Sequence, residues 1–313
     1  MNFKEIPSHI AFIERRSTID LFIRIKKDFR LFAARGAHLS EEQFNQISSE
    51  KVRLFIKIDD SADGEVSLDA HLMGILTDPG VNPQVKAGIA YAATVKTIQD
   101  VFQGTNSRTL AELKKMSGKI VKLIVSDNRV IDNFITLTSS DPYTLMHSVK
   151  VGIYGTAITI SLFQGTIDDH KIEDLSMAYF LHDIGMTRVP GAILNKEENL
   201  TQSEWETVKR HPVWGQEKLR KANYLDDEAT GIVLYHHERC DGSGYPLRKA
   251  GDEIPVFAKI CAIADTFESL TSGRPFSPSK SPFEALRIMQ GNLARGFDPK
   301  LFKAFIVLLG PGR

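Results

Sequence analysis

The middle and C-terminal parts of the sequence contain histidines and aspartates whose types and spacing could bind metal ions. Nine histidines occur in the chain. Six of them fall between residues 147 and 237, and all of these except His170 are candidate ligands. A His–Asp pair closes the apolar run LSMAYFL, and a further aspartate lies inside the apolar segment CAIADTFESL. The seven candidate ligands are His147, His182, Asp183, His211, His236, His237 and Asp265.

A shared cation explains this set better than seven separate core residues do. A single histidine on an apolar helical face is usually a hydrogen-bonded core residue, but several imidazoles and two carboxylates buried without partners would cost several kcal/mol per charge. Imidazole and carboxylate ligands suit Fe, Mn, Zn or Co and do not suggest Ca. Seven ligands exceed the needs of one ion that keeps open positions. The set therefore predicts two metals that share a carboxylate, as in phosphoester hydrolysis, with Asp183 as the bridge and the catalytic residue.

The segment HHERCDGSGYP, residues 236–246, directly follows the last histidine pair. Its DGSG stretch is typical of a turn, because glycine tolerates positive φ and lets the backbone approach a ligand closely. Such a stretch alone indicates a surface loop, but next to a metal-binding pair it predicts a lip of the site. Glu238 is predicted to orient a ligand histidine, and Cys240 to be structural.

Composition argues against several classes of protein. Lys+Arg and Asp+Glu balance at 39 each, so no net charge favours a nucleic-acid polymer or an acidic membrane surface. The first residues lack the apolar core of a signal peptide, and no apolar stretch approaches the roughly 20 residues of a membrane span. Two cysteines are too few for a disulfide framework. We therefore expect a cytoplasmic protein without membrane insertion.

The elements that must position the candidate ligands follow a small N-terminal domain, predicted over residues 1–62. IDLFIRI (19–25) and VRLFIKI (52–58) alternate with the period of half-buried strands. HLSEEQFNQI (38–47) between them is predicted to be a helix with a capping box of Ser40 and Gln43. Strand, helix and strand together predict an α/β fold for this domain.

From about residue 80 onward the pattern is helical, so the predicted fold class is mainly α. Asn82 and Asp141 each precede a proline that suits the first helical position, and Thr201 with Glu204 forms a capping box. Pro212 is predicted to end the helix that Thr201 begins. We expect a helical linker over residues 63–125 and the metal-dependent domain over 126–313. The predicted helices span residues 82–102, 108–125, 141–163, 200–212, 281–290 and 299–309.

The motifs from residue 147 onward resemble the HD-GYP family, a subgroup of the HD superfamily of metal-dependent phosphohydrolases. The matching stretches are HDIGM, PGAILNK, LTQSEWETVKRHPVWG, HHERCDGSGYP, AKICAIADTFESLTSGRPF and FDP. The resemblance implies a helical HD-type bundle with a two- or three-metal site, often iron, that hydrolyses the bacterial second messenger cyclic di-GMP to pGpG or GMP. The segment from residue 17 to 60 is similar to a module often found at the N-terminus of HD-GYP proteins.

The resemblance also assigns roles to individual residues. All seven candidate ligands fall on metal-ligand positions of the family, and Tyr143 replaces the glutamate that supplies a third metal in one branch. A two-metal site is therefore implied, with iron favoured and Mn, Zn or Co as alternatives. Substrate contacts are implied for Gly244, Tyr245 and Arg274, and support of the ligands for Glu238 and Glu268.

Several departures from the family pattern concern phosphate-contacting groups. The family usually has lysine where this chain has Met186, and Phe276 and Ser277 replace a tyrosine and a cation. Loss of one such donor typically costs on the order of 10²–10³ in rate. Two functions therefore stay open: a phosphodiesterase acting on cyclic di-GMP or a related cyclic dinucleotide, and a catalytically degenerate receptor or interaction module that keeps its metals. A third reading is hydrolysis of another phosphoester. Protein partners and a homodimer are left open.

Overall fold

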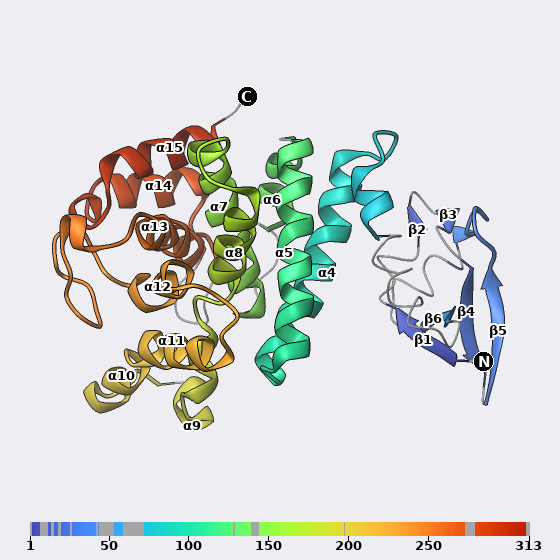
Figure 1. The fold of residues 1–313 in the computed structure, drawn as a ribbon, viewed down its shortest axis with the longest axis horizontal. Coiled ribbons are helices and arrows are strands. Elements are labelled where there is room, and N and C mark those ends of the chain that lie inside the picture. The colour runs from blue at the N-terminus through green and yellow to red at the C-terminus, as the bar shows by residue number, and fades with distance from the viewer. Residues whose placement is uncertain are drawn as a thin grey trace. The chain divides into compact units, whose positions relative to one another are not determined.

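The chain forms two compact units, residues 1–93 and 94–313. Strands occur mainly in the first unit and helices in the second (Figure 1). The predicted fold class, mainly α with a C-terminal helical HD-type bundle and a small N-terminal α/β domain, is confirmed. The predicted boundaries at residues 62 and 125 stay predictions. The computed structural model describes residues 2–6, 12–13, 16–17, 20–25, 27–41, 43, 53–58, 72–127, 129–138, 144–196, 198–272 and 279–310.

The first unit contains a four-stranded antiparallel sheet with the strand order β1-β6-β4-β5. Its strands are β1 (Asn2–Ile6), β4 (Leu21–Ile25), β5 (Asp28–Ala33) and β6 (Leu54–Ile58), and β2 (Phe12–Ile13) pairs separately with β3 (Arg16–Ser17). The predictions for β4 and β6 are confirmed. β1 and β5 were not predicted, and in β5 the burial does not alternate, since Leu31 is 56% exposed.

The core of this sheet domain is small. Leu21, Ala33, Leu39 and Leu54 are its buried members, with partly buried side chains around them. Ser40 and Gln43 form the predicted capping box: the Gln43 amide donates to Ser40 Oγ and the Ser40 amide to Gln43 Oε1. Most of the helix predicted after this box lies outside the described residues.

The second unit is helical, and α4 runs across the boundary between the two units. A short helix over residues 72–77 precedes it. The helices are α4 (Pro83–Gln103), α5 (Ser107–Ser126), α6 (Arg129–Thr138), α7 (Thr144–Phe163), α8 (Asp169–Phe180), α9 (Gly191–Leu194), α10 (Gln202–Val208), α11 (His211–Ala222), α12 (Asp227–Tyr235), α13 (Val256–Thr271), α14 (Pro282–Gln290) and α15 (Pro299–Leu309), with 3₁₀ helices η1 (Ile184–Arg188), η2 (Gly251–Glu253) and η3 (Ala294–Gly296).

Local capping signals set several helix starts. Asn82 Oδ1 accepts from the Gln84 amide, and Thr201 caps α10 in a capping box with Glu204, both as predicted. The prediction for Pro212 was wrong: α10 ends at Val208, and Pro212 lies in the first turn of α11. Proline suits that position because an amide there would lack an intrahelical partner.

α7 lies at the centre of the helical unit. It packs against α8, α13 and α15, while α5 packs against α8 and α11 against both η1 and α12. Figure 1 shows α5, α7 and α8 side by side, and buried residues occur on all sides of α7, as expected for a helix inside a bundle. Within the described part of the chain, the helices are too short or too polar for a membrane span.

Candidate metal centre

The structure brings the seven predicted ligands together from five segments. His147 lies in the first turn of α7, and His182 and Asp183 lie between α8 and η1. His211 is the first residue of α11, the pair His236–His237 follows α12, and Asp265 lies within α13. Two of these segments follow the C-termini of α8 and α12, where carbonyl oxygens without helical partners are available to orient a side chain.

Asp183 is central to the cluster. Its Oδ1 lies 3.1 Å from His211 Nε2 and 3.6 Å from His236 Nε2. Its Oδ2 lies 3.7 Å from His147 Nε2 and 3.6 Å from His182 Nε2. Two groups with metal-ligating geometry result, one made of His147, His182 and Asp183 and the other of Asp183, His211, His236 and His237. The Asp183 carboxylate therefore belongs to both.

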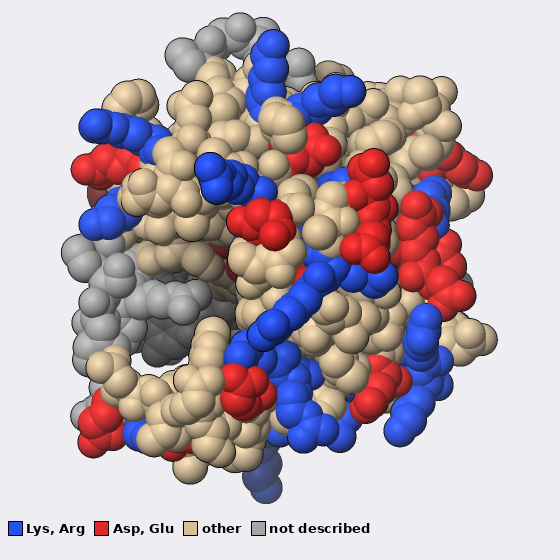
Figure 2. Space-filling view, turned by 90° about the vertical axis from the view of Figure 1, so that its left-hand side faces the viewer, with Lys and Arg blue, Asp and Glu red and all other residues tan. Residues whose placement is uncertain are grey.

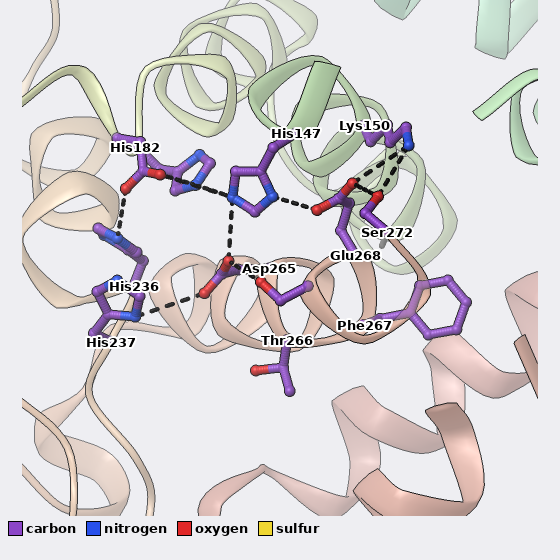
Figure 3. Close-up of polar contacts among 12 residues, drawn as sticks. His147, Lys150, His182, His236, His237, Asp265, Thr266, Phe267, Glu268 and Ser272 are labelled. Atoms are coloured by element: carbon purple, nitrogen blue, oxygen red, sulfur yellow. Dashed lines mark hydrogen bonds and ion pairs between the residues drawn. The ribbon is translucent and has the colours of Figure 1, made fainter. Parts of the chain in front are cut away.

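Asp265 connects the two groups on another side. Its Oδ1 lies 3.3 Å from His147 Nε2, and its Oδ2 lies 3.6 Å from His237 Nδ1 (Figure 3). The side chain is largely buried, at 8% exposure. All seven predicted ligands are therefore linked by short contacts.

Hydrogen bonds with the backbone indicate which ring nitrogens are free to bind a cation. In His182, His211 and His236, the ring Nδ1 lies 2.8–2.9 Å from the carbonyl oxygen three residues earlier in the chain. Because a carbonyl only accepts, Nδ1 carries the proton and Nε2 of the neutral ring presents a lone pair. His211 Nε2 and His236 Nε2 nevertheless face each other at 3.2 Å. Burial lowers the pKa of His211, but the hydrogen bond with Asp183 raises it more, so a cation that binds this ring competes with a proton. When both rings are neutral, their opposed lone pairs suit a divalent metal placed between them.

A series of buried hydrogen bonds orients His147, which belongs to the ligand group of His182 and Asp183. Its Nδ1 donates to Glu268 Oε2, and Glu268 Oε1 accepts from Ser272 Oγ. Lys150 Nζ donates to Ser272 Oγ at 3.0 Å and lies 3.4 Å from Glu268 Oε1 (Figure 3). Glu268 and Lys150 are 2% and 3% exposed. Glu268 thus lies where a carboxylate would fix the tautomer and direction of a metal-binding histidine.

The electrostatics of the cluster keep its carboxylates ionised. Burial raises the pKa of Asp183, but the neighbouring histidines lower it more, and the net pKa lies well below the usual range. For Asp265, burial likewise raises the pKa, but His147 and His237 lower it by more, so the net pKa lies below the usual range. Burial lowers the pKa of His182 to about 4, so this imidazole is neutral at pH 7. Ionised carboxylates and neutral imidazoles are the forms that bind cations.

His147 has the opposite shift. Burial lowers its pKa, but hydrogen bonds with Asp265 and Glu268 raise it to about 10. A cation that binds His147 Nε2 must therefore displace a proton, and binding is coupled to proton release.

A close helix approach brings Asp183 to His211. A Cβ placed on Gly185 would lie 1.9 Å from the His211 carbonyl oxygen and 2.6 Å from the Gly215 amide nitrogen. Only glycine allows η1 to lie this close to α11. We had not predicted this role, although Gly185 is part of the HDIGM motif.

The loop after His237 is tied to the cluster. The Tyr245 amide donates to the His237 carbonyl oxygen at 3.2 Å, and the Tyr245 ring stacks on the His237 ring with centroids 4.6 Å apart. A Cβ on Gly244 would lie 2.5 Å from the His237 carbonyl oxygen, so the loop backbone rests directly on the metal-binding segment. Two of the three predicted substrate contacts, Gly244 and Tyr245, thus form a wall next to His237.

The partners of the Glu238 carboxylate differ from those predicted. Its side chain is 1% exposed and was expected to orient a ligand histidine. Instead, Glu238 Oε1 accepts from the Leu247 amide at 2.7 Å and Oε2 from the Lys249 amide at 3.0 Å. The carboxylate satisfies backbone donors of the loop and fixes its conformation. Cys240 belongs to neither group of candidate ligands.

Met186 belongs to neither ligand group, and several other predicted residues lie outside the described residues. Met186 is partly buried and packs against the apolar group of Val189, Val208 and Trp214. Arg274, a predicted substrate contact, lies outside the described residues, as do Tyr143, Phe276 and Ser277.

Comparisons with known proteins agree with this site. The family model of the HD domain matches residues 136–301. A cyclic di-GMP phosphodiesterase of Pseudomonas aeruginosa is 34% identical over 222 residues, which cover 71% of this chain and 52% of that protein. A 3′3′-cGAMP-specific phosphodiesterase of Vibrio cholerae is 29% identical over 319 residues, covering 93% and 66%. The chain thus spans between half and two-thirds of the length of these relatives.

One solved structure has the same fold. It is a protein of Bdellovibrio bacteriovorus described as an HDG"Y"P protein, with a TM-score of 0.69 and 18% sequence identity. The match covers 99% of this chain and 100% of that protein. At this identity, the likeness concerns the fold alone.

Proposed function

Because this chain belongs to the HD domain family, and within it to the HD-GYP proteins, we propose that it is a two-metal phosphodiesterase of cyclic dinucleotides, with cyclic di-GMP as the first candidate. The observation that carries the proposal is the position of Asp183, whose two oxygens face two different sets of histidines. Two sets that share one carboxylate suit two divalent ions.

The donor set limits the metals. Five imidazoles and two carboxylates suit Fe, Mn, Zn or Co. Among these, the resemblance to the HD-GYP family favours Fe. When bound, two such ions supply an activated water at neutral pH and neutralise charge on the phosphate.

The chain's own residues would orient the metal ligands and contact the substrate. Backbone carbonyls hold the Nε2 atoms of His182, His211 and His236 toward the centre, and Glu268 does the same for His147. Gly244, Tyr245 and Arg274 are the proposed substrate contacts, and Tyr245 covers one face of His237. Hydrolysis of one phosphodiester bond of cyclic di-GMP would give pGpG, and hydrolysis of the second would give GMP.

A turnover assay tests the proposal. The protein is loaded with Fe(II) under anaerobic conditions, or with Mn(II), and incubated with cyclic di-GMP and with 3′3′-cGAMP. Chromatography of the nucleotides is expected to show a linear dinucleotide or mononucleotide product. Absence of product from both substrates with both metals would reject a phosphodiesterase function.

The position of Met186 favours a second candidate function, a metal-containing receptor of cyclic dinucleotides that does not cleave them. The family usually has lysine there, and in this chain the thioether packs into an apolar group. In a receptor, calorimetry would detect saturable cyclic di-GMP binding without product.

If the missing cation limits catalysis, Met186→Lys is expected to raise turnover by on the order of 10²-fold. The long lysine stem can stay on the apolar group while its ammonium reaches water.

We also propose a division into residues 1–62, 63–125 and 126–313, a cytoplasmic location, and contacts with protein partners or a second copy. Limited proteolysis tests the division, since cleavage is expected near residues 62 and 125. Light scattering tests the association, and cell fractionation tests the location.

A further inference from the structure

A cavity of about 620 Å³ lies between α10, the start of α11 and the loop over residues 242–248. We call it the basic pocket. Figure 2 shows Lys and Arg side chains gathered on the lower half of one face of the molecule. The pocket is lined by Trp205, Glu206, Lys209, Arg210, Gly242, Ser243, Gly244, Tyr245, Pro246 and Arg248.

The charge of this lining is positive. The lining contains three cations and one carboxylate. The cations are Lys209, Arg210 and Arg248, and the carboxylate, Glu206, pairs with Lys209 at 2.5 Å. Within the described parts of the chain, no carboxylate forms an ion pair with Arg210 or Arg248. A hydrogen bond from Lys209 and, to a smaller extent, the charge of Arg248 lower the pKa of Glu206. The Arg210 guanidinium lies 5.1 Å from the centre of the Trp214 ring, which limits its freedom. Two guanidinium groups that no carboxylate binds directly suit phosphate oxygens, which they can bind through two parallel hydrogen bonds.

The backbone at Arg248 is in an unfavourable conformation for arginine. Its φ is 54°, in the left-handed region where a side chain costs free energy and glycine does not. The buried Glu238 carboxylate binds the amides of Leu247 and Lys249, the residues on either side, and so holds this conformation. A strained residue that its surroundings hold in place often marks a functional site. The structure thus presents the Arg248 side chain to the pocket at a conformational cost.

The pocket and the metal cluster share a wall. Tyr245 lines the pocket and stacks on His237, and its amide binds the His237 carbonyl oxygen. Across the pocket, Trp205 is 43% exposed, and its ring is 6.4 Å from the Tyr245 ring and nearly perpendicular to it. Exposed aromatic rings beside cations are the means by which proteins bind nucleotides, with bases stacked on rings and phosphates on cations.

We propose that the basic pocket binds the half of a cyclic dinucleotide that is not being cleaved. Its phosphate would lie on Arg248 and Arg210, and its base would stack on Trp205. The identity of this ligand rests on the proposed function. A cyclic dinucleotide has two phosphates, so a ligand with one at the metal cluster needs an anion-binding site for the other nearby. The pocket would supply a phosphate grip that the chain lacks at Met186.

Arg248→Gly is the decisive variant, because glycine suits the backbone at this position and removes only the side chain. We expect the KM for cyclic di-GMP to rise about 10- to 100-fold with little change in kcat, as for loss of a charge-assisted hydrogen bond. Hydrolysis of bis(4-nitrophenyl) phosphate, which has a single phosphate, should be unchanged. The melting temperature should stay equal or rise. Lys221→Ala, an exposed cation at the far end of α11, is the matched control.

The outcomes separate this inference from the proposed function. If wild type hydrolyses cyclic di-GMP, and Arg248→Gly and Arg210→Ala keep its KM, the pocket assignment is overturned while the function stands. If wild type hydrolyses nothing, calorimetry with cyclic di-GMP on the metal-loaded protein decides. Binding that weakens tenfold or more in Arg248→Gly then supports the pocket, and equal or absent binding overturns it.

Discussion

The metal cluster and the basic pocket lie on opposite sides of the Tyr245–His237 stack, yet they are built in opposite ways. The cluster consists of imidazoles and carboxylates, and two of its histidines, His182 and His236, are fully buried. The pocket is lined by guanidinium, ammonium and aromatic groups with a single carboxylate, Glu206, and its arginines are exposed. The cluster therefore attracts cations and the pocket anions, as a site that holds metals and a phosphodiester requires.

The two regions also differ in what holds them. The cluster lies at helix ends inside the bundle, and its histidines bind helix carbonyls. The pocket depends on a loop that one buried carboxylate, Glu238, fixes through two amides. Buried groups of like polarity that face each other are costly without a partner. Metal binding should accordingly affect both stability and activity, whereas changes in the pocket should affect substrate affinity alone.

The largest effect is expected for Asp183→Asn, which removes the charge shared by both ligand groups. We expect metal content to fall and kcat to drop on the order of 10³-fold, because a bridging ligand serves both metals. Elemental analysis and the turnover assay measure the two effects. His170→Gln is the matched control, since this α8 histidine has an 87% exposed side chain and lies outside the cluster. Full metal content in Asp183→Asn would contradict the bridging role and weaken the contrast with the pocket.

A smaller loss is expected for Glu268→Gln, which keeps the size of the group that orients His147 but removes its charge. Outer carboxylates of this kind typically contribute 10- to 100-fold to metal affinity. The measurement is competition for the metal with a chelator of known affinity, with the melting temperature as a check on folding. Glu173→Gln is a close control, because Glu173 also pairs with a histidine, the exposed His170 at 3.3 Å, and lies outside the cluster. Equal losses in both variants would mean that the contact of Glu268 with His147 adds nothing.

Parts of the fold and of the site could be predicted because their signals are local or chemical. The starts of α4, α10 and α14 depend on Asn82, Thr201 and Ser281, side chains that bind nearby backbone amides. β4 and β6 follow from alternating apolar residues. The seven candidate ligands were found from residue type, since few side chains bind divalent metals.

The remaining features depend on contacts that residue types do not reveal. Glu238 was assigned to a histidine, but its partners are backbone amides nine and eleven residues later, which any residue could supply. The left-handed backbone at Arg248 has no signature, because arginine is rare in that conformation. Gly185 faces a carbonyl 26 residues away, a contact that exists only once η1 and α11 have packed.

The smallest effect is expected at the capping box of α10, the helix that carries Trp205 into the basic pocket. Hydrogen bonds with Lys196 and with the Thr201 amide lower the pKa of Glu204 from 4.5 to about 2. A lowered carboxylate pKa stabilises the folded state above the unfolded pKa, and this stability is lost as pH falls from 4.5 toward 2. Glu204→Gln should therefore be slightly less stable than wild type at pH 7, with the difference shrinking by pH 3.

Denaturant unfolding at pH 7, 5 and 3 measures this difference, with the exposed Glu198→Gln as control. Because Glu204 is at the surface, salt screens its ion pair, and the difference should also shrink in 1 M NaCl. Metal content should not change, since α10 supplies none of the candidate ligands. The KM for cyclic di-GMP should rise slightly as the pocket wall loosens. Loss of metal in Glu204→Gln would show that the two regions are coupled and do not respond separately.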